Sequence, residues 1–540
     1  MKKQVTATAL AVALAAGVLS GCGGSDSTEG ASSTASQATL QETGTVTYPV
    51  ESNGEKLTIW CPMQPPAAKY ITSYNDQEVF QEISKRTGIE VEFIHPALGQ
   101  EREQLGLLIA SGELPDIIQI RGFYPGGAAA GVDDGVFLDM TDLMAQYAPD
   151  YYKIITSSDE AWRLATSNDN RITDFNIIKQ SAPAFTRINF LDTTVEKYGM
   201  TEMPVTIEDY DELFAKMQAD GLPGFAPDGN GRVEQFMWPY GITPEYSLDT
   251  EGNLQYGPYT EAYKDYLTMM NSWYTKGYLY KDFMSNLTAN DRMSLFVNGQ
   301  VGMMVNPVDL ATNNARAQGH EISIANYPRL EEGQEIPFET VSWDTLPITN
   351  EPMTTVISAD SKNKELAMQY LNYFYTQEGA DLCNWGIEGK SYVVKEDGTK
   401  EYTDYMLKNP DIALADAQTM LKIHLCAKLA EPDVVCNPNI LVDEEAGKLR
   451  NMYSDDTTVN DSRTMPVFSM SLEASTERAE IMRDINTYIG EMTLKFITGA
   501  TPLSEFDTYM QTLKDMGIED AIQITTDEYQ RFMEKKAPVA

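Results

Sequence analysis

The chain has 540 residues with 40 basic and 80 acidic side chains, which gives a formal net charge of −40. This length exceeds what one hydrophobic core usually serves, so we expect two lobes. The acidic balance repels phosphate backbones, which excludes nucleic acid as an expected partner. It also disfavours polyanionic ligands unless a local basic pocket outweighs the overall field.

The first residues predict export from the cytoplasm. Two lysines precede a run of small apolar residues at 5–19, the pattern of a secretory signal. The run is shorter than the roughly 20 apolar residues that span a membrane. It ends in Leu-Ser-Gly-Cys at 19–22, which resembles the bacterial lipoprotein cleavage box. The resemblance implies a signal peptide over 1–21, cleavage before Cys22 and acyl chains, palmitate included, at Cys22. An ordinary signal peptide with a chance cysteine is the alternative.

Residues 22–54 are predicted to be a flexible tether. The stretch 23–47 is rich in Gly, Ser, Thr and Gln and has no apolar face to bury. Two or more acyl chains hold a protein stably at a membrane, whereas one chain gives marginal binding. We therefore expect a monomeric body held by lipid on the extracytoplasmic face of the cell membrane.

From residue 57 onward the pattern alternates between strands and helices. Apolar residues with a period of two, or short buried runs, predict strands at 57–60, 89–93 and 117–120. Apolar residues at helical spacing, each run followed by glycine, predict helices at 78–87 and 100–111. This order is typical of a parallel sheet covered by helices.

The alternation starts again further along the chain, which predicts a second lobe. Strands are expected at 184–191, 302–305 and 354–357, and helices at 206–219, 260–276, 291–298 and 363–376. Thr206 followed by Asp209 provides a capping start for the first of these helices. After about residue 402 the chain is expected to be mainly helical.

Eight short segments carry a family resemblance, among them Arg-Thr-Gly-Ile-Glu-Val at 86–91, Ile-Ala-Ser-Gly-Glu-Leu-Pro-Asp-Ile-Ile at 109–118 and Phe-Val-Asn-Gly-Gln-Val-Gly-Met at 296–303. The others lie at 99–101, 274–278, 363–367, 375–380 and 386–392. In this order they resemble the bacterial extracellular solute-binding proteins of ABC importers, in particular the long lipoprotein branch that binds oligosaccharides. The region after about residue 405 matches only loosely.

The resemblance implies an α/β fold of the two-lobed periplasmic-binding-protein type II, with hinge crossings and a mainly helical C-terminal region. The implied first lobe comprises 55–187 and 352–395, and the second comprises 188–351 and 396–540. Crossings between the lobes are expected near 187–189, near 351–354 and between about 392 and 402.

The resemblance also implies a function. It predicts a lipid-anchored subunit that captures an oligosaccharide in the cleft between the lobes and delivers it to the transmembrane subunits of an ABC permease. A neutral oligosaccharide suits the acidic surface better than a uronate. No cofactor, bound metal or catalytic residue is expected.

Carbohydrate sites combine aromatic platforms with planar hydrogen-bonding side chains inside a cleft. The candidates lie at predicted strand ends, in loops or near crossings: Trp60, Gln64, Arg121, Arg187, Asn189, Trp238, Trp343, Asp344, Trp385 and Glu388. For each tryptophan a core position is the alternative, and for each arginine it is a surface ion pair of little energy. Trp385 and Glu388 are the strongest candidates, and replacing both by Ala is expected to weaken binding without unfolding.

One loop invites comparison with a metal site. Relatives often carry a calcium loop after the first helix of the second lobe, and the corresponding stretch here is 226–235. Asp228, Asn230 and Glu234 offer oxygen ligands, but Ala226 and Gln235 stand where acids are expected, and Arg232 lies within the loop. Because calcium takes six to eight oxygens, the loop is predicted to be metal-free.

Motifs of catalysis are absent from the sequence. The three histidines, His95, His320 and His424, belong to no HExxH pattern, and no GxSxG elbow or Walker loop occurs. A glycoside hydrolase needs only two carboxylates, so that hypothesis stays open, as does a ligand-sensing subunit for a membrane kinase.

Apart from Cys22 the chain has four cysteines, Cys61, Cys383, Cys426 and Cys436, and none forms a CxxC pair, so a zinc ribbon is not expected. We favour buried thiols at these positions. A disulfide between Cys426 and Cys436 is the alternative, and the exported location permits it.

Overall fold

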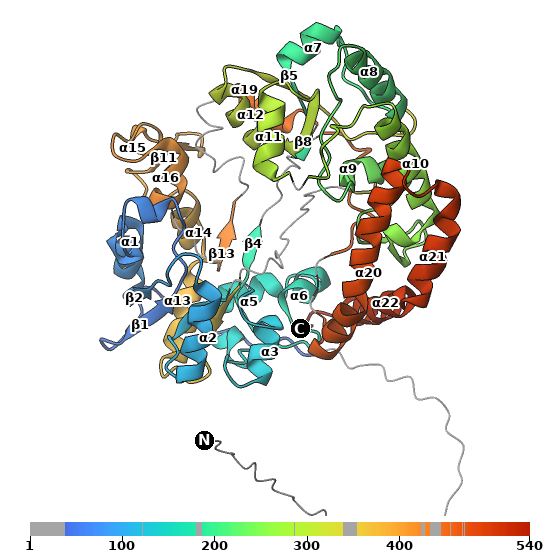
Figure 1. Ribbon diagram of the computed structural model, residues 1–540. Coiled ribbons are helices and arrows are strands. Elements are labelled where there is room, and N and C mark those ends of the chain that lie inside the picture. The colour runs from blue at the N-terminus through green and yellow to red at the C-terminus, as the bar shows by residue number, and fades with distance from the viewer. Residues whose placement is uncertain are drawn as a thin grey trace, which may run out of the picture.

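The computed structural model describes residues 38–120, 122–179, 186–285, 287–338, 354–422, 427–431, 444–453, 455–466, 468 and 470–539. These residues form two α/β lobes and a layer of long C-terminal helices (Figure 1). The predicted two-lobed α/β fold is confirmed. Among the described helices, none is both long and apolar enough to cross a membrane.

The first lobe is built on a four-stranded sheet in the order β10-β3-β1-β2. The strands are β1 (Lys56–Trp60), β2 (Glu90–Ile94), β3 (Ile117–Gln119) and β10 (Thr355–Ile357). β1 pairs in parallel with β2 and β3, whereas β10 runs antiparallel to β3. Successive side chains face opposite sides, so Ile59 and Trp60 belong to two different core clusters. Both faces of the sheet are therefore covered.

The helices of the first lobe surround this sheet: α1 (Glu78–Thr87), α2 (Glu101–Ser111), α3 (Gly127–Asp133), α4 (Met144–Tyr147), α5 (Pro149–Ile155), α6 (Asp159–Ala165), α13 (Lys364–Tyr373) and α14 (Gln377–Asn384). Helix α1 matches its predicted bounds because Val79, Phe80 and Ile83 lie on one buried face. Gly88 then adopts a left-handed conformation with φ of 74°, which ends the helix.

The second lobe contains an antiparallel sheet in which β5 (Thr186–Leu191) lies between β8 (Met303–Pro307) and β9 (Ile322–Ala325). A separate hairpin pairs β6 (Tyr246–Leu248) with β7 (Leu254–Tyr256). The helices are α7 (Asp192–Tyr198), α8 (Ile207–Ala219), α9 (Glu234–Met237), α10 (Glu261–Thr275), α11 (Ala289–Val297), α12 (Val308–Ala317) and α19 (Glu444–Asn451).

Helix α8 begins at the predicted capping box. The Asp209 backbone N–H donates to Thr206 Oγ1 at 3.1 Å, and the Thr206 N–H donates to Asp209 Oδ2 at 2.7 Å. These two bonds satisfy donors that would otherwise lack partners at the helix start.

The segment before β1 is more ordered than a tether. From residue 38 the chain packs on the first lobe, with the Gly44 N–H donating to the Ala145 carbonyl at 2.9 Å. The Tyr48 hydroxyl donates to the Gln369 carbonyl at 2.7 Å, and its ring lies 5.0 Å from the ring of Tyr373. The tether predicted for 22–54 thus differs from the structure after residue 37, because Tyr48 gives this stretch an apolar anchor.

Residues 392–422 and 427–431 also pack on the first lobe, although the predicted boundary assigned everything after 395 to the second. They form the hairpin β11 (Tyr392–Val394) and β12 (Lys400–Tyr402), helices α15 (Asp404–Leu407) and α16 (Leu414–Leu421), and strand β13 (Lys428–Ala430). β13 pairs in parallel with β4 (Ile177–Lys179), and Lys69 forms an ion pair with Asp416 at 2.9 Å.

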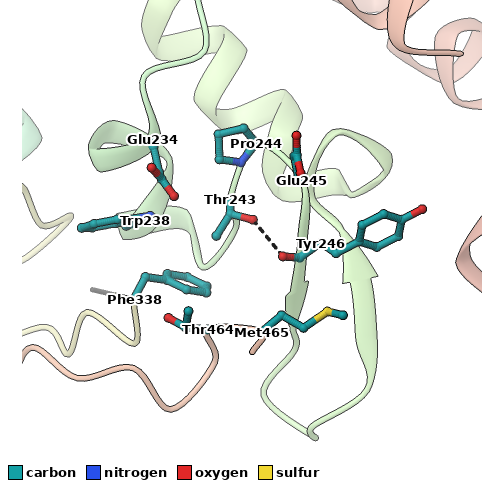
Figure 2. Close-up of a pocket in the computed structure, with 9 residues that line it drawn as sticks. All are labelled: Glu234, Trp238, Thr243, Pro244, Glu245, Tyr246, Phe338, Thr464 and Met465. Atoms are coloured by element: carbon teal, nitrogen blue, oxygen red, sulfur yellow. Dashed lines mark hydrogen bonds between the residues drawn. The ribbon is translucent and has the colours of Figure 1, made fainter. Parts of the chain in front are cut away.

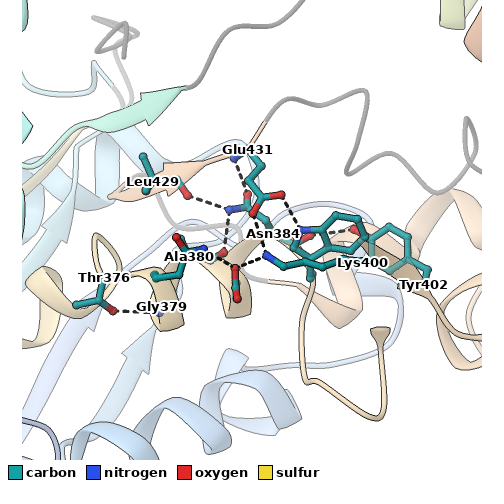
Figure 3. Close-up of polar contacts among 11 residues, drawn as sticks. Thr376, Gly379, Ala380, Asn384, Lys400, Tyr402, Leu429 and Glu431 are labelled. Carbon is teal, nitrogen blue, oxygen red and sulfur yellow. Dashed lines mark hydrogen bonds and ion pairs between the residues drawn. The ribbon is translucent and has the colours of Figure 1, made fainter. Parts of the chain in front are cut away.

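A polar network fixes this stretch in place (Figure 3). The indole N–H of Trp385 donates to Glu431 Oε2 at 2.6 Å, and Lys400 forms ion pairs with Glu431 and Asp381. Asn384 holds β13 directly, because its side chain donates to the Leu429 carbonyl at 2.9 Å. The network therefore joins α14, β12 and the end of β13.

The described chain changes from one lobe to the other after β4 at 179, after residue 338, after residue 431 and between Met465 and Met470. The first two crossings lie next to the predicted ones. The third differs, because residues 392–402 form a hairpin on the first lobe.

The C-terminal helices α20 (Leu472–Thr498), α21 (Phe506–Asp515) and α22 (Ile518–Glu534) lie along the second lobe and return to the first (Figure 1). There the Lys535 ammonium donates to the Thr166 carbonyl at 2.7 Å.

Cys61 and Cys383 are buried thiols, as predicted. Burial raises the pKa of Cys383 to about 12, so its thiolate is not populated at neutral pH. Cys426 and Cys436 lie outside the described residues, as does the proposed lipidation site Cys22.

Candidate functional site

A pocket of about 340 Å³ opens at the carboxyl end of β3, and we call it the first-lobe pocket. Open α/β sheets bind ligands at the carboxyl ends of their strands. Three stretches that are distant in sequence meet here, namely the loop after α6, the turn before β4 and the residue before β10. Their polar side chains that line the pocket are Thr166, Ser167, Thr173, Asp174, Asn176 and Thr354.

Asp174 is the acidic group among the described residues of the first-lobe pocket. The Thr173 hydroxyl donates to Asp174 Oδ1 at 2.9 Å. Burial raises the pKa of Asp174 to about 6, and hydrogen bonds from Thr173 and Thr354 oppose that shift. At neutral pH the group is therefore a charged acceptor in a poorly solvated place, and a ligand hydroxyl there would gain a charge-assisted hydrogen bond.

A second pocket of about 370 Å³ lies in the other lobe, and we call it the second-lobe pocket. Figure 2 shows its lining, which combines aromatic rings, carboxylates and hydroxyl groups: Glu234, Trp238, Thr243, Pro244, Glu245, Tyr246, Phe338, Thr464 and Met465. Thr243 Oγ1 donates to the Tyr246 carbonyl at 3.4 Å, which ties the approach of β6 to the start of that strand. Helix α9 supplies Glu234, and the 3-10 turn that follows supplies Trp238.

The carboxyl group of Glu234 lies in a poorly solvated part of the second-lobe pocket. Burial raises the pKa of Glu234, the neighbouring charge of Glu245 raises it further, and the indole of Trp238 opposes the shift. The indole N–H of Trp238 is the donor of that opposing contact, and the side chain is 1% exposed. The pocket thus holds a partly desolvated carboxyl group beside a buried indole donor.

The two pockets are each lined by residues that flank the same chain segments between the lobes. Phe338 lines the second-lobe pocket and Thr354 the first-lobe pocket, and these residues flank one crossing. Met465 and Met470 likewise line one pocket each, and the chain between them spans at most about 18 Å. Each lobe thus has one pocket beside the segments that join the lobes, and we take the two pockets together as the candidate site.

Trp60 and Gln64 were predicted to contact ligand at the end of β1. The Trp60 side chain is instead 1% exposed and packs between the sheet and α2, with its ring 6.3 Å from that of Phe123. Gln64 is half-buried in the following loop, where its backbone N–H donates to the Tyr74 hydroxyl at 2.9 Å. The structure gives Trp60 a core position.

Arg187 and Asn189 both lie on the central strand β5 and are fully buried. The Arg187 guanidinium lies 4.5 Å from the centre of the Tyr327 ring and donates to the Tyr327 hydroxyl. The Asn189 amide donates to the carbonyls of Met304 and Asn306 at 3.2 and 3.0 Å, so it ties β5 to β8. Both residues hold the second-lobe sheet together.

Trp238 is the predicted tryptophan that the structure places in a pocket. Its ring packs edge-on against Tyr327, with centroids 4.7 Å apart, while one side lines the second-lobe pocket. Trp238 is thus both a core residue and a wall of the candidate site.

Trp385 and Glu388 differ in their exposure. Trp385 is 2% exposed and its indole N–H donates to Glu431, whereas Glu388 is exposed at the surface. Arg121, Trp343 and Asp344 lie outside the described residues.

The pocket residues that the sequence did not indicate are Asp174, Thr354, Glu245, Tyr246 and Phe338. A weak signal existed for Tyr246, because a polar turn with one glycine at 249–253 separates two short apolar stretches and is typical of a hairpin. No local sequence pattern indicates Asp174 as a site residue, because its pocket is formed by parts of the chain that are distant in sequence.

The loop that resembles a calcium site is closed by its own hydrogen bonds. The Gly231 N–H donates to the Asp228 carbonyl at 3.0 Å, and the Tyr266 hydroxyl donates to the Gly231 carbonyl at 2.7 Å. Arg232 Nη1 donates to the Pro244 carbonyl at 3.3 Å. Among the described residues, no cluster of three or more His, Cys, Asp or Glu side chains is arranged to hold a metal.

Calcium is accordingly expected to leave the melting temperature unchanged. A cation that binds only the folded state raises the free energy of unfolding as its concentration exceeds the dissociation constant, but the Arg232 guanidinium in this loop disfavours a second cation. Differential scanning fluorimetry with EDTA and with excess calcium chloride measures the effect. A calcium-dependent rise in Tm that Asp228→Asn abolishes would contradict the prediction.

Comparison with known proteins gives consistent matches. A sequence model of the family described as "Bacterial extracellular solute-binding protein" matches residues 69–381. The fructooligosaccharide ABC transporter substrate-binding protein FusA of Streptococcus pneumoniae is 21% identical over 99% of both chains. The polygalacturonan/rhamnogalacturonan-binding protein YtcQ of Bacillus subtilis is 21% identical over 97% of both chains.

Among solved structures, a human-milk-oligosaccharide (HMO) binding solute-binding protein associated with an ABC transporter in Bifidobacterium longum infantis superposes with a TM-score of 0.69 at 14% identity. The match covers 89% of this chain and 100% of that chain. At this identity the superposition shows a shared fold.

Proposed function

Because the chain belongs to the family of bacterial extracellular solute-binding proteins, we propose that it is the substrate-binding subunit of an ABC importer and that it captures an oligosaccharide between its lobes. The observation that carries the proposal is the pair of pockets, one in each lobe, whose linings flank the chain segments that join the lobes. The relative FusA is itself named for fructooligosaccharide uptake, which supports a sugar as the class of ligand.

The chemistry of the two pockets suits a sugar. The second-lobe pocket offers the rings of Trp238, Tyr246 and Phe338, against which the C–H faces of a sugar can stack. The first-lobe pocket offers hydroxyl and carboxylate groups that pair with sugar hydroxyls. A ligand that contacts both walls favours the closed arrangement, because closure gains free energy only from contacts made in that state.

The proposed location follows from the N-terminal sequence. Acyl chains at Cys22 would hold the protein at the outer face of the cell membrane, and residues 23–37 would separate the lipid from the body. The folded lobes could then deliver ligand to the permease subunits in the same membrane.

A screen of neutral plant and host oligosaccharides by thermal shift tests this proposal. At a ligand concentration about 100 times the dissociation constant, the free energy of unfolding should rise by about 2.7 kcal/mol. The glycan should be recovered intact, because a binding protein creates no new reducing ends.

The same assay separates binding from hydrolysis. If reducing ends accumulated and Glu234→Gln stopped their release, the chain would be a glycoside hydrolase that uses the carboxylate pair of the second-lobe pocket. Failure of every glycan to raise Tm would reject an oligosaccharide as the ligand.

A further inference from the structure

Helix α22 is anchored in both lobes. Ile518 and Ala521, near its start, are fully buried in the hydrophobic core of the second lobe. Ala537, beyond its end, is 7% exposed within the core of the first lobe. The helix has 17 residues and a length of about 25 Å, so it connects the two cores directly (Figure 1). A displacement of one lobe is therefore transmitted through α22 to the other.

The end of α22 contacts a loop that forms one wall of the first-lobe pocket. This loop follows α6 and lines the pocket with Thr166. The buried Lys535 ammonium, directly after α22, donates to the Thr166 carbonyl at 2.7 Å. Further along the loop, the side-chain amide of Asn168 donates to Glu528 Oε2 at 2.5 Å. Two charged side chains from this end of the chain thus hold the wall.

Glu528 also holds a second wall of the same pocket. Met470 lines the pocket, and the next residue, Ser471, is the N-cap of α20. The Ser471 backbone N–H donates to Glu528 Oε2 at 3.0 Å, and the Ser471 hydroxyl donates to Oε1 at 3.2 Å. The Glu528 side chain is 2% exposed. A buried carboxylate is costly unless its oxygens accept hydrogen bonds, and here the donors come from both walls.

We propose that Glu528 is a positioning residue for the first-lobe pocket and holds two of its walls in the arrangement that binds ligand. This inference rests on the proposed function and deepens it, because it links the pocket of one lobe to a helix rooted in the core of the other. Any movement of the lobes that displaces the end of α22 also displaces both walls. The affinity of the pocket therefore depends on how the lobes are arranged.

Hydrogen exchange of the folded, ligand-free, full-length chain tests the positioning directly. Glu528→Ala should speed exchange at the two walls, residues 164–171 and 470–475, by about tenfold or more, because one hydrogen bond to a charged group shifts an equilibrium by at least that factor. Asn168→Ala removes only the bond to the loop, so it should loosen 164–171 and leave 470–475 as in the parent. Helix α10, in the core of the second lobe, should keep its protection in both variants.

Two further variants separate the hydrogen bonds from the charge. Glu528→Gln keeps an acceptor oxygen for both walls and should retain most of the protection that Glu528→Ala loses. Arg531 forms an ion pair with Glu528 at 2.5 Å, but it lies on the same helix and its side chain is 61% exposed. Arg531→Ala therefore removes one exposed ion pair, touches neither wall and serves as the matched control.

Affinity is then measured by calorimetry with each oligosaccharide that raises the Tm of the parent in the thermal-shift screen. Glu528→Ala and Asn168→Ala should bind about tenfold more weakly than the parent, because apparent affinity falls with the fraction of molecules whose walls are in place. Glu528→Gln and Arg531→Ala should stay within about twofold of the parent.

The proposal is overturned if Glu528→Ala leaves exchange at both walls unchanged, if Glu528→Gln loosens them as much as Glu528→Ala does, or if the walls loosen and the affinity stays that of the parent. Equal loss of protection in the walls and in α10, in both alanine variants, would show a purely structural role and would also overturn it. Failure of the proposed function looks different, because the parent itself then binds no oligosaccharide of the screen. The exchange experiment needs no ligand and still decides whether Glu528 holds the walls.

Discussion

Asp174→Asn is expected to stabilise the ligand-free protein at neutral pH and to weaken ligand binding. The carboxylate lines the first-lobe pocket, and burial raises its pKa from the ordinary 3.8 to about 6. A raised pKa means that the folded state holds the proton more tightly than the unfolded state does. The charged form therefore lowers the free energy of unfolding at neutral pH, and the amide removes that cost.

The sign of the pH dependence follows from these two pKa values. Below about pH 4 the group is protonated in both states and contributes nothing. Between about 4 and 6 the unfolded state loses its proton first, so stability falls as the pH rises. Above about 6 the full cost is present, and from the size of the shift it is at most about 3 kcal/mol.

Ligand affinity should fall in this variant, whereas the stability of the ligand-free protein should rise. A hydrogen bond to a charged group contributes about 1.5–3 kcal/mol, so Asp174→Asn should weaken affinity about 10- to 100-fold. Urea denaturation of the variant and the parent across this pH range, with calorimetry on a glycan that binds, measures both effects. Asp142→Asn removes an exposed charge in the same lobe and serves as the control. A variant that is less stable at neutral pH and binds normally would show that Asp174 serves the fold.

The regular elements were predictable because local pattern decides them. Helix α1 has an apolar face at 79, 80 and 83 and a glycine after its last residue, and these signals need no tertiary context. The predicted position of the third crossing differs from the structure although a local signal was present. The turn at Asp397 and Gly398 between two short strands is a hairpin signal, whereas the family resemblance implies a crossing there.

The site was much less predictable. A tryptophan beside a strand end serves a core as well as a pocket, and only the register of β1 shows that Trp60 faces α2. Asp174 and Thr354 are far apart in sequence, and they share a pocket only because β4 and β10 begin at the same edge of the first lobe. No hydrophobic periodicity in either stretch of sequence predicts that the two residues share a pocket.

Trp385→Ala should destabilise the first lobe by about 3–5 kcal/mol, the usual cost of truncating a buried aromatic side chain. The indole is 2% exposed and packs against Tyr402 and Tyr392, with ring centroids 4.7 and 5.8 Å away. Its N–H also donates to Glu431, which directly follows β13 and leads into the third crossing. Loss of the indole should therefore loosen β13 as well as the core.

Three variants measured by urea denaturation and hydrogen exchange separate these contributions. Trp385→Phe keeps most of the packing and loses one hydrogen bond to a charged group, so it should cost about 1.5–3 kcal/mol. Glu388→Ala alters an exposed side chain and should stay within about 0.5 kcal/mol. Faster exchange in β13 and in its partner β4 is expected for Trp385→Ala alone. If Trp385→Ala instead kept full stability and lost ligand affinity, the indole would belong to the ligand site, as its position in the sequence first indicated.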